Sequence, residues 1–235
     1  MQTKLKVKLL AYTPDADKLV AAAAKLCYSA ADVDTLLGSL TAEKVGSFID
    51  LLADLGHESP IEHAPYTFAV EGVSRALLAQ LTRHRIASYS VQSQRYVNKA
   101  EFDYIIPPSI EDDAELREKY IDCMEMLDTY YTYFRSANIP AEDARFVLPN
   151  ACDTRIIFTM NARSLHNFFR LRCCNRAQWE IRAMADEMLR LCREVSPVLF
   201  RRTGASCEAT GKCSEGAMCC GEPRKGGENN NENRN

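Results

Sequence analysis

Alternation of apolar and polar positions predicts β-strands at residues 4–12, 66–73 and 154–160. Successive side chains of a strand point to opposite faces of a sheet, so this alternation is typical of strands with one buried face. A shorter apolar run at residues 102–106, ended by Pro107 and Pro108, predicts a fourth strand. These strands are few and far apart in the sequence.

Helical spacing of apolar residues covers most of the remaining chain. It predicts helices at residues 15–28, 41–55, 74–85, 112–137, 140–146, 164–173 and 178–193. Thr41, Ser74 and Ser164 are suited to cap three of these helices, Gly56 to end the second, and Pro140 to occupy a first turn. Few strands among long helices indicate the α+β class rather than a doubly wound sheet.

The chain has 235 residues, a net charge of −3 and ten cysteines. This charge gives no general attraction to nucleic acid or to an anionic membrane, and no apolar run approaches the ~20 residues of a membrane span. The first residues show no secretory leader, so we expect reduced thiols and a cytoplasmic protein.

Composition changes after about residue 204, which divides the chain into a domain at 1–204 and a tail at 205–235. Cys207, Cys213, Cys219 and Cys220 lie in this tail, but their spacing is not that of paired CxxC motifs, so we predict no metal site. A zinc-binding tail remains an alternative. The final stretch, GEPRKGGENNNENRN, is predicted to be disordered.

Residues 80–96, QLTRHRIASYSVQSQRY, gather cationic and hydroxyl side chains without one acid. Such charges need an anion, which either the fold or a ligand must supply. Leu77, Gln80, Leu81 and His84 would share one helical face, which suggests a helix that lines a polar cavity. The alternative is a basic, solvated helix end.

No glycine occurs between Val73 and Thr203, which excludes a P-loop and a GxGxxG turn there. Phosphates would have to be held by arginines and hydroxyls. His57 and His63 are six residues apart around Pro60, so they do not form an HExxH zinc motif. We therefore expect residues 57–63 to be an irregular loop that meets a ligand or caps a neighbouring element.

In a second stretch, residues 161–179, helical spacing places Arg172 on an apolar face with Leu165, Phe168 and Phe169. An arginine there needs a partner. The partner is either a carboxylate, such as Glu62 or Glu180, or the anion or carbonyl of a ligand, and the sequence favours neither.

The pattern RHRxxSxxxxSxR at residues 83–95 resembles the hallmark of the flavin-dependent thymidylate synthases. HESPIEHAPYTF, ARFVLP and NARSLHNFFRLR…AQWEIR also resemble blocks of this family, in the same order. The resemblance covers residues 4–202. It implies a small mixed sheet flanked by long helices, in a homotetramer whose active sites are shared between subunits.

The resemblance also implies an activity: methylation of dUMP to dTMP with 5,10-methylenetetrahydrofolate, NADPH and FAD. The residues that would bind FAD are His57, Ser59, Arg83, His84, Arg85, Val91, Asn161, Arg163 and Asn167. Those that would bind dUMP are Gln80, Arg83, Gln92, Ser93, Gln94, Arg95, Arg145 and Arg172. Arg172 is the predicted catalytic residue, which would favour ionisation of the uracil ring, and Ser93 is a positioning donor rather than a nucleophile.

One position departs from the family pattern, because Val91 stands where Glu or Gln is frequent, with Gln92 beside it. Only a backbone contact is then available at Val91. Two readings from other classes remain: a nucleotide- or nucleic-acid-binding module whose arginines grip phosphates, and a zinc-binding structural protein.

Overall fold

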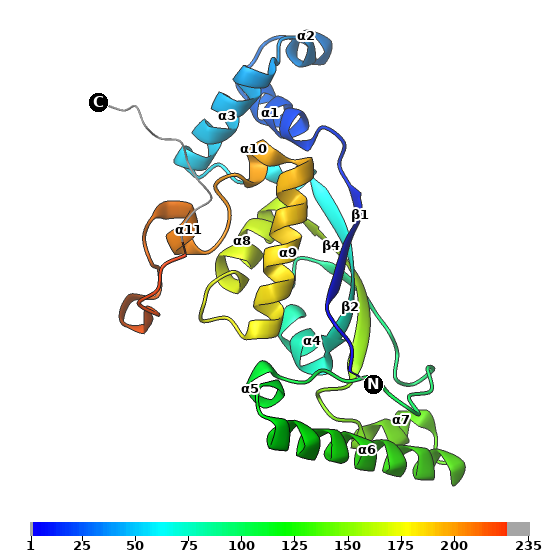
Figure 1. Ribbon diagram of the computed structural model, residues 1–235. Coiled ribbons are helices and arrows are strands. Elements are labelled where there is room, and N and C mark those ends of the chain that lie inside the picture. The colour runs from blue at the N-terminus through cyan, green and yellow to red at the C-terminus, as the bar shows by residue number, and fades with distance from the viewer. Residues whose placement is uncertain (1, 225–235) are drawn as a thin grey trace. The chain divides into compact units, whose positions relative to one another are not determined.

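The computed structural model describes residues 2–224. Its contacts divide the chain into two compact units (Figure 1). Among the described residues, unit 1 comprises 2–8 and 69–158, and unit 2 comprises 9–68 and 159–224. Of the stretch 221–235 predicted to be disordered, residues 221–224 are described and Arg224 pairs with Asp186 at 2.8 Å, contrary to the prediction, while the asparagine-rich remainder lies outside the described residues. The division at residue 204 stays a prediction.

Four strands form one sheet in the order β1–β2–β4–β3: β1 (Lys6–Tyr12), β2 (Pro65–Ser74), β4 (Asp153–Asn161) and β3 (Ser88–Val91). The sheet is antiparallel, not mixed as predicted. In unit 2 the Thr67 hydroxyl bonds that of Thr159, and in unit 1 the Arg75 amide donates to the Cys152 carbonyl. Residue numbers therefore rise along β2 as they fall along β4. The α+β class is confirmed.

Unit 1 is built on one long helix beside its share of the sheet. Figure 1 shows α6 with α5 at its start and α7 beside it, and both pack against it. The helices of this unit are α4 (Arg75–Leu81), α5 (Pro108–Glu111), α6 (Ala114–Ser136) and α7 (Ala141–Ala144).

The strand predicted at residues 102–106 is wrong. Tyr104 makes only isolated bridges, to Gln2 and to Cys152, and no ladder continues from them. Phe102, Tyr104 and Ile106 instead join Met124 and Cys152 in a buried cluster. The prolines that follow lack the N–H groups needed to extend a strand.

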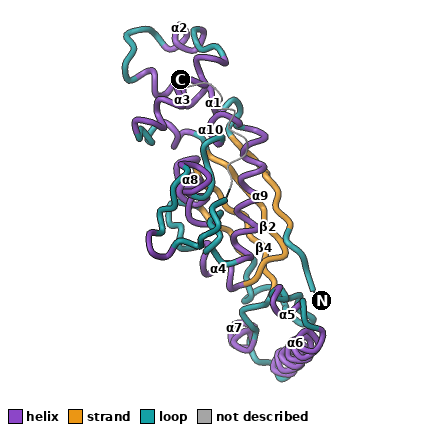
Figure 2. The backbone as a smooth tube through the Cα atoms, turned by 60° about the vertical axis from the view of Figure 1, so that its left-hand side comes forward, coloured by secondary structure: helices purple, strands orange, loops and turns teal. Residues whose placement is uncertain are grey.

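Unit 2 holds the remaining helices, and Figure 2 shows α1, α2 and α3 gathered together, with α8 next to α9. Tyr66 and Phe169 both pack against the ring of Phe200, at centroid distances of 5.3 and 6.1 Å. The Tyr66 hydroxyl also bonds Ser196 Oγ at 2.7 Å. The helices are α1 (Ala16–Leu26), α2 (Val33–Gly38), α3 (Ala42–Leu55), α8 (Ala162–Arg172), α9 (Trp179–Val195), α10 (Pro197–Phe200) and α11 (Ser206–Thr210).

Side-chain caps decide where several helices begin. Thr41 and Ser74 cap α3 and α4 as predicted. Ser164 does not cap α8, because the Asn161 carboxamide accepts the Ser164 amide at 2.9 Å and starts the helix directly after β4. No helix among residues 2–224 has the length and apolar character needed to cross a membrane.

Candidate functional site

The RHR motif lies in a turn after α4, not inside a helix as predicted. α4 ends at Leu81, and the His84 amide bonds the Leu81 carbonyl at 3.1 Å. The Tyr89 hydroxyl lies 2.9 Å from the Leu81 carbonyl and 2.8 Å from that of His84. Burial raises the pKa of Tyr89 to about 12, so this hydroxyl remains a donor. Tyr89 thus fastens the turn that presents the motif.

The two arginines of this turn are exposed cations. Within residues 2–224, neither Arg83 nor Arg85 forms an ion pair with an acid. Arg95 differs, because its guanidinium pairs with Glu142 at 2.9 Å. Glu142 therefore balances the charge of Arg95 within the fold, while Arg83 and Arg85 remain available to bind an anion from outside the described chain.

The polar residues that follow the turn are partly engaged inside unit 1. Ser93 Oγ accepts the Arg95 amide at 3.1 Å. The Gln92 carboxamide accepts Lys99 Nζ at 2.7 Å, while the buried Gln94 donates to Cys152 Sγ at 3.7 Å. The Gln94 side chain is thus directed into the unit rather than to its surface.

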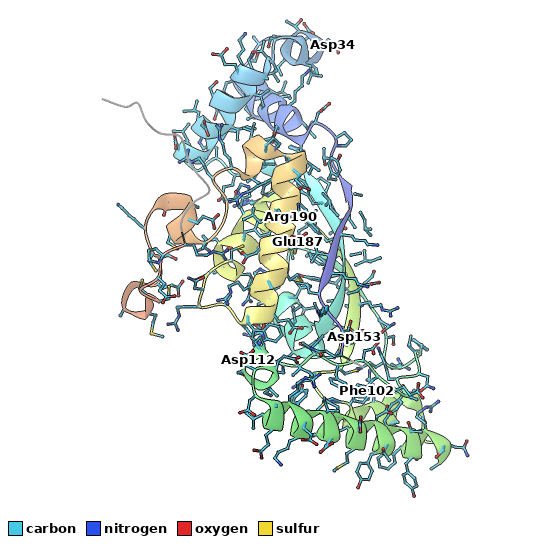
Figure 3. All side chains as sticks on the ribbon, in the orientation of Figure 1. Asp34, Phe102, Asp112, Asp153, Glu187 and Arg190 are labelled. Carbon is cyan, nitrogen blue, oxygen red and sulfur yellow. The ribbon has the colours of Figure 1, made fainter. Side chains whose placement is uncertain are left out.

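Sequence reasoning missed a group of partly buried charges in unit 1. Burial lowers the pKa of Arg75, as does nearby Arg145, one of the predicted substrate ligands. Asp153 starts β4 (Figure 3), and burial raises its pKa although Lys99 opposes the shift. Its Oδ1 is buried without a hydrogen-bond partner among the described residues. The sequence did offer a signal for these buried charges, because Arg75 and Asp153 lie beside the first residues of a predicted helix and a predicted strand.

In unit 2, Arg163 joins α8 to the segment before β2. Its guanidinium contacts Glu58 at 3.0 Å and Glu62 at 2.5 Å. Glu62 lies in a short 3₁₀ turn, Pro60–His63, where an irregular loop was expected. Asn167 on the same helix accepts Arg170 at 2.9 Å. Since Asn161 caps α8, its carboxamide oxygen is also engaged.

Three of the predicted FAD ligands, His57, Ser59 and Arg163, line one cavity of about 400 Å³ beside the end of α1. A second cavity of about 310 Å³ shares His57 and includes His166. Burial lowers the pKa of His166 to about 4, so its imidazole is neutral at pH 7 and contacts Thr203 Oγ1 at 3.3 Å. His166 was not among the predicted residues.

Arg172 is the last residue of α8. Leu165, Phe168 and Phe169 are fully buried as the helical spacing predicted, but Arg172 is only half-buried. Arg172 is therefore less buried than the three apolar side chains with which it was predicted to share a face.

Comparison with known proteins places the chain in a family. The model of the Thy1 family, described as thymidylate synthase complementing protein, matches residues 8–198. The flavin-dependent thymidylate synthase of Clostridium tetani is 53% identical over 234 residues, which cover 93% of this chain and 94% of that protein. The enzyme of the same name from Geobacter sulfurreducens is 50% identical over 220 residues, again covering 93% and 94%.

The chain belongs to the flavin-dependent thymidylate synthase family. The resemblance read from the RHR motif is thereby confirmed. A solved structure, the UMP/dUMP methylase PolB from Streptomyces cacaoi bound with 5-Br dUMP, has the same fold with a TM-score of 0.76. It is 23% identical and covers 84% of this chain and 93% of PolB.

The predicted ligands of this thymidylate synthase family member fall into two sets. Unit 1 holds Gln80, Arg83, His84, Arg85, Val91, Gln92, Ser93, Gln94, Arg95 and Arg145, and unit 2 holds His57, Ser59, Asn161, Arg163, Asn167 and Arg172. In the part of the chain that the structure describes, no three histidine, cysteine or acidic side chains are grouped so that they could hold a metal.

Proposed function

We propose that this protein methylates C5 of dUMP to form dTMP, with 5,10-methylenetetrahydrofolate as carbon donor, FAD as cofactor and NADPH as reductant. The observation that carries the proposal is the match to the family over residues 8–198 with every fixed position of RHRxxSxxxxSxR present at residues 83–95. The name flavin-dependent thymidylate synthase, borne by relatives about half identical to this chain, supports the same activity.

The donor set fits a dinucleotide that carries phosphates. Arg83 and Arg85 are exposed cations without an acid partner among residues 2–224, and charge-assisted hydrogen bonds to phosphate are stronger than neutral ones. His57, Ser59 and Arg163 line a cavity that offers further polar contacts. When bound, FAD supplies the hydride. The role of the chain is to bind and orient it.

For dUMP, we propose that Arg95 and Arg145 hold the phosphate. Arg95 would exchange its pairing with Glu142 for the ligand, and Arg145 is half-buried with its Nε on the Glu142 carbonyl at 3.0 Å. Arg172 would contact the pyrimidine, where a fixed cation favours the N3-ionised ring and raises electron density at C5.

Ser93 is proposed to position the substrate, and not to act as a nucleophile. Its Oγ accepts the Arg95 amide, and no hydrogen bond described for residues 2–224 joins it to a general base of the kind that activated serines require. We further propose that the protein is a homotetramer whose sites are completed by residues of different chains. This last proposal rests on the family resemblance and is tested by the mass of the assembly in solution.

The visible spectrum of the purified protein tests the function. We expect a yellow protein with a flavin band that NADPH bleaches, and formation of dTMP when dUMP and methylenetetrahydrofolate are added. A colourless protein that takes up no FAD on reconstitution would refute the proposal.

Substitution of Arg172 tests its role. We expect Arg172→Ala to lose dUMP binding or turnover while FAD stays bound, and Arg172→Lys to be poor because an ammonium does not reproduce a planar fork. Arg190→Ala is the matched control, since Arg190 projects from α9 and pairs with Glu187 at 2.7 Å (Figure 3). Activity of Arg172→Ala close to that of the control would show that the assigned role is wrong.

A further inference from the structure

Lys99 is a buried lysine of unit 1, in the loop that follows the RHR motif and β3. The residue is only 9% exposed, and lysine is almost never buried to this extent unless its ammonium has partners. Nζ donates to the side-chain oxygen Oε1 of Gln92 at 2.7 Å and to the backbone carbonyl of Asp153 at 3.4 Å. The Lys99 amide donates to the Tyr131 hydroxyl at 3.2 Å, which ties the loop to α6. The fold therefore keeps a cation beside Gln92, one of the predicted dUMP ligands.

Gln92 is fixed through its backbone as well as through its side-chain oxygen. Its amide donates to the Arg155 carbonyl at 2.9 Å, and its own carbonyl accepts Arg75 Nη1 at 3.5 Å. Only the side-chain nitrogen Nε2 remains, and no hydrogen bond described for residues 2–224 engages it. Nε2 is also not among the polar atoms that are buried without a partner in that part of the chain. Its N–H groups can therefore reach a ligand.

The Lys99 ammonium decides which way the Gln92 carboxamide faces. An ammonium only donates hydrogen bonds, so the atom beside it has to be the carboxamide oxygen and not the nitrogen. A carboxamide without such a neighbour can turn over and offer a ligand either its oxygen or its N–H groups. Held by Lys99, the carboxamide of Gln92 offers N–H groups alone. A donor of this kind recognises an acceptor oxygen, which a nucleotide carries on its phosphate and on the carbonyls of uracil.

We propose that Lys99 is a positioning residue, which orients the Gln92 carboxamide so that Nε2 donates to an acceptor oxygen of the bound nucleotide. The inference rests on the proposed function, because Gln92 lies inside the motif at residues 83–95 and next to Ser93. The neighbouring Val91 has no polar side-chain atom, so Gln92 supplies the N–H groups that Val91 lacks. Lys99 acts through Gln92 and does not itself touch the nucleotide.

A purely structural role for Lys99 is the alternative. Its contacts with the Asp153 carbonyl and with Tyr131 would then stabilise unit 1 without affecting the ligand. Gln92→Glu separates the two roles. Its carboxylate keeps an acceptor beside the ammonium and makes that hydrogen bond charge-assisted, but it has no N–H to offer a ligand at neutral pH. The contact with Lys99 is thus retained while the donor is removed.

Calorimetric titration of dUMP into the FAD-loaded protein measures the effect. We expect Gln92→Glu to weaken dUMP binding by about tenfold or more, while Tm and the flavin absorbance stay at their wild-type values. Lys99→Met should also weaken binding, but it should cause no further loss in a Gln92→Ala background, because Lys99 acts through Gln92. Lys119→Met is the matched control, since Lys119 is an exposed lysine on α6 that pairs with Glu115 at 3.6 Å.

Deoxyuridine, which lacks the phosphate, identifies the acceptor oxygen. If Gln92→Glu weakens deoxyuridine binding as much as dUMP binding, the acceptor belongs to the nucleoside. If deoxyuridine binds both proteins equally, the acceptor is a phosphate oxygen. Either result agrees with the proposed role of Lys99.

Two results would overturn the proposal. The first is equal affinity of wild type and Gln92→Glu for dUMP. The second is a loss on Lys99→Met that is just as large in the Gln92→Ala background, which would assign Lys99 a structural role. A wild-type protein that binds FAD but no dUMP would instead refute the proposed function itself. Because Gln92→Glu retains the contact with Lys99, its titration decides the matter even where Lys99→Met does not fold.

Discussion

Gly72 in β2 allows a decisive test of how the strand that precedes α4 and the RHR turn is held. Its φ is +70°, and a Cβ built there would lie 1.9 Å from the carbonyl oxygen and 2.4 Å from the carbonyl carbon of Lys4. Both atoms are backbone, so the chain before β1 would have to retreat by about 1 Å to reach the closest Cβ contact that folded proteins show. β2 therefore has no room for a side chain at residue 72.

Two costs combine in Gly72→Ala. The left-handed conformation disfavours a Cβ by about 1–2 kcal/mol. Forcing backbone apart in a packed site costs a further 1–3 kcal/mol or so. We expect the free energy of unfolding to fall by about 3 kcal/mol, which for a chain of this size lowers Tm by roughly 6–12 °C.

Gly46→Ala is the matched control. Gly46 lies inside α3, and a Cβ added there meets nothing within 4 Å. Alanine forms helices better than glycine, so this variant should be more stable by about 0.5–1 kcal/mol. Both variants are measured by urea unfolding and calorimetry at one protein concentration, because assembly would otherwise shift Tm.

The opposite signs of the two effects make the test strict. If Gly72→Ala unfolds within a degree or two of wild type, β1 and β2 do not approach each other as described. If Gly46→Ala loses stability as well, the measured loss is a general effect of substituting glycine and says nothing about the close approach of Lys4 to Gly72.

Two further predictions concern unit 2. The pKa of His166 is about 4 in the folded protein and near 6.5 in the unfolded chain, so as the pH falls the unfolded state binds a proton that the folded state does not. The free energy of unfolding should therefore drop by about 2 kcal/mol between pH 7 and pH 5. Urea unfolding of His166→Gln should show a flatter dependence on pH, and an unchanged slope would contradict the assignment to His166. Arg163→Met should cost less than about 1–2 kcal/mol in stability, because its ion pairs are exposed, but should weaken FAD binding tenfold or more in a fluorescence titration. Glu58→Gln keeps the guanidinium and should keep the affinity; equal losses in both variants would mean that Arg163 acts only by holding the loop.

Local chemistry made much of this fold predictable. The α+β class and the caps at Thr41 and Ser74 follow from residue patterns within a few positions of each feature. Where two caps compete, pattern alone does not decide: Asn161 and Ser164 are three residues apart, and the earlier one wins because β4 ends there. The strand at residues 102–106 failed because its side chains pack into a cluster that forms only in three dimensions.

The candidate site was likewise predictable where local sequence specifies it, and not where it depends on contacts between distant residues. The sequence blocks indicated candidate arginines, but not that Arg95 is paired with Glu142 or that Arg163 is held by Glu58. These partners are 47 and 105 residues away in the sequence, and no local pattern specifies such a pairing. Of the two sources of an anion left open by the sequence, the fold supplies one for Arg95, through Glu142, while neither Arg83 nor Arg85 has an acid partner among residues 2–224.

The hydroxyl of Tyr89 has one proton and two carbonyl neighbours, at Leu81 and His84. The one O–H proton is shared between two acceptors, so a single side chain ties the last residue of α4 to the turn that follows it. Since the pKa of Tyr89 is about 12, the hydroxyl keeps its proton in neutral and in moderately alkaline solution alike. The hydrogen bonds of this hydroxyl should therefore persist as the pH rises from neutral to moderately alkaline values that stay below the pKa of Tyr89.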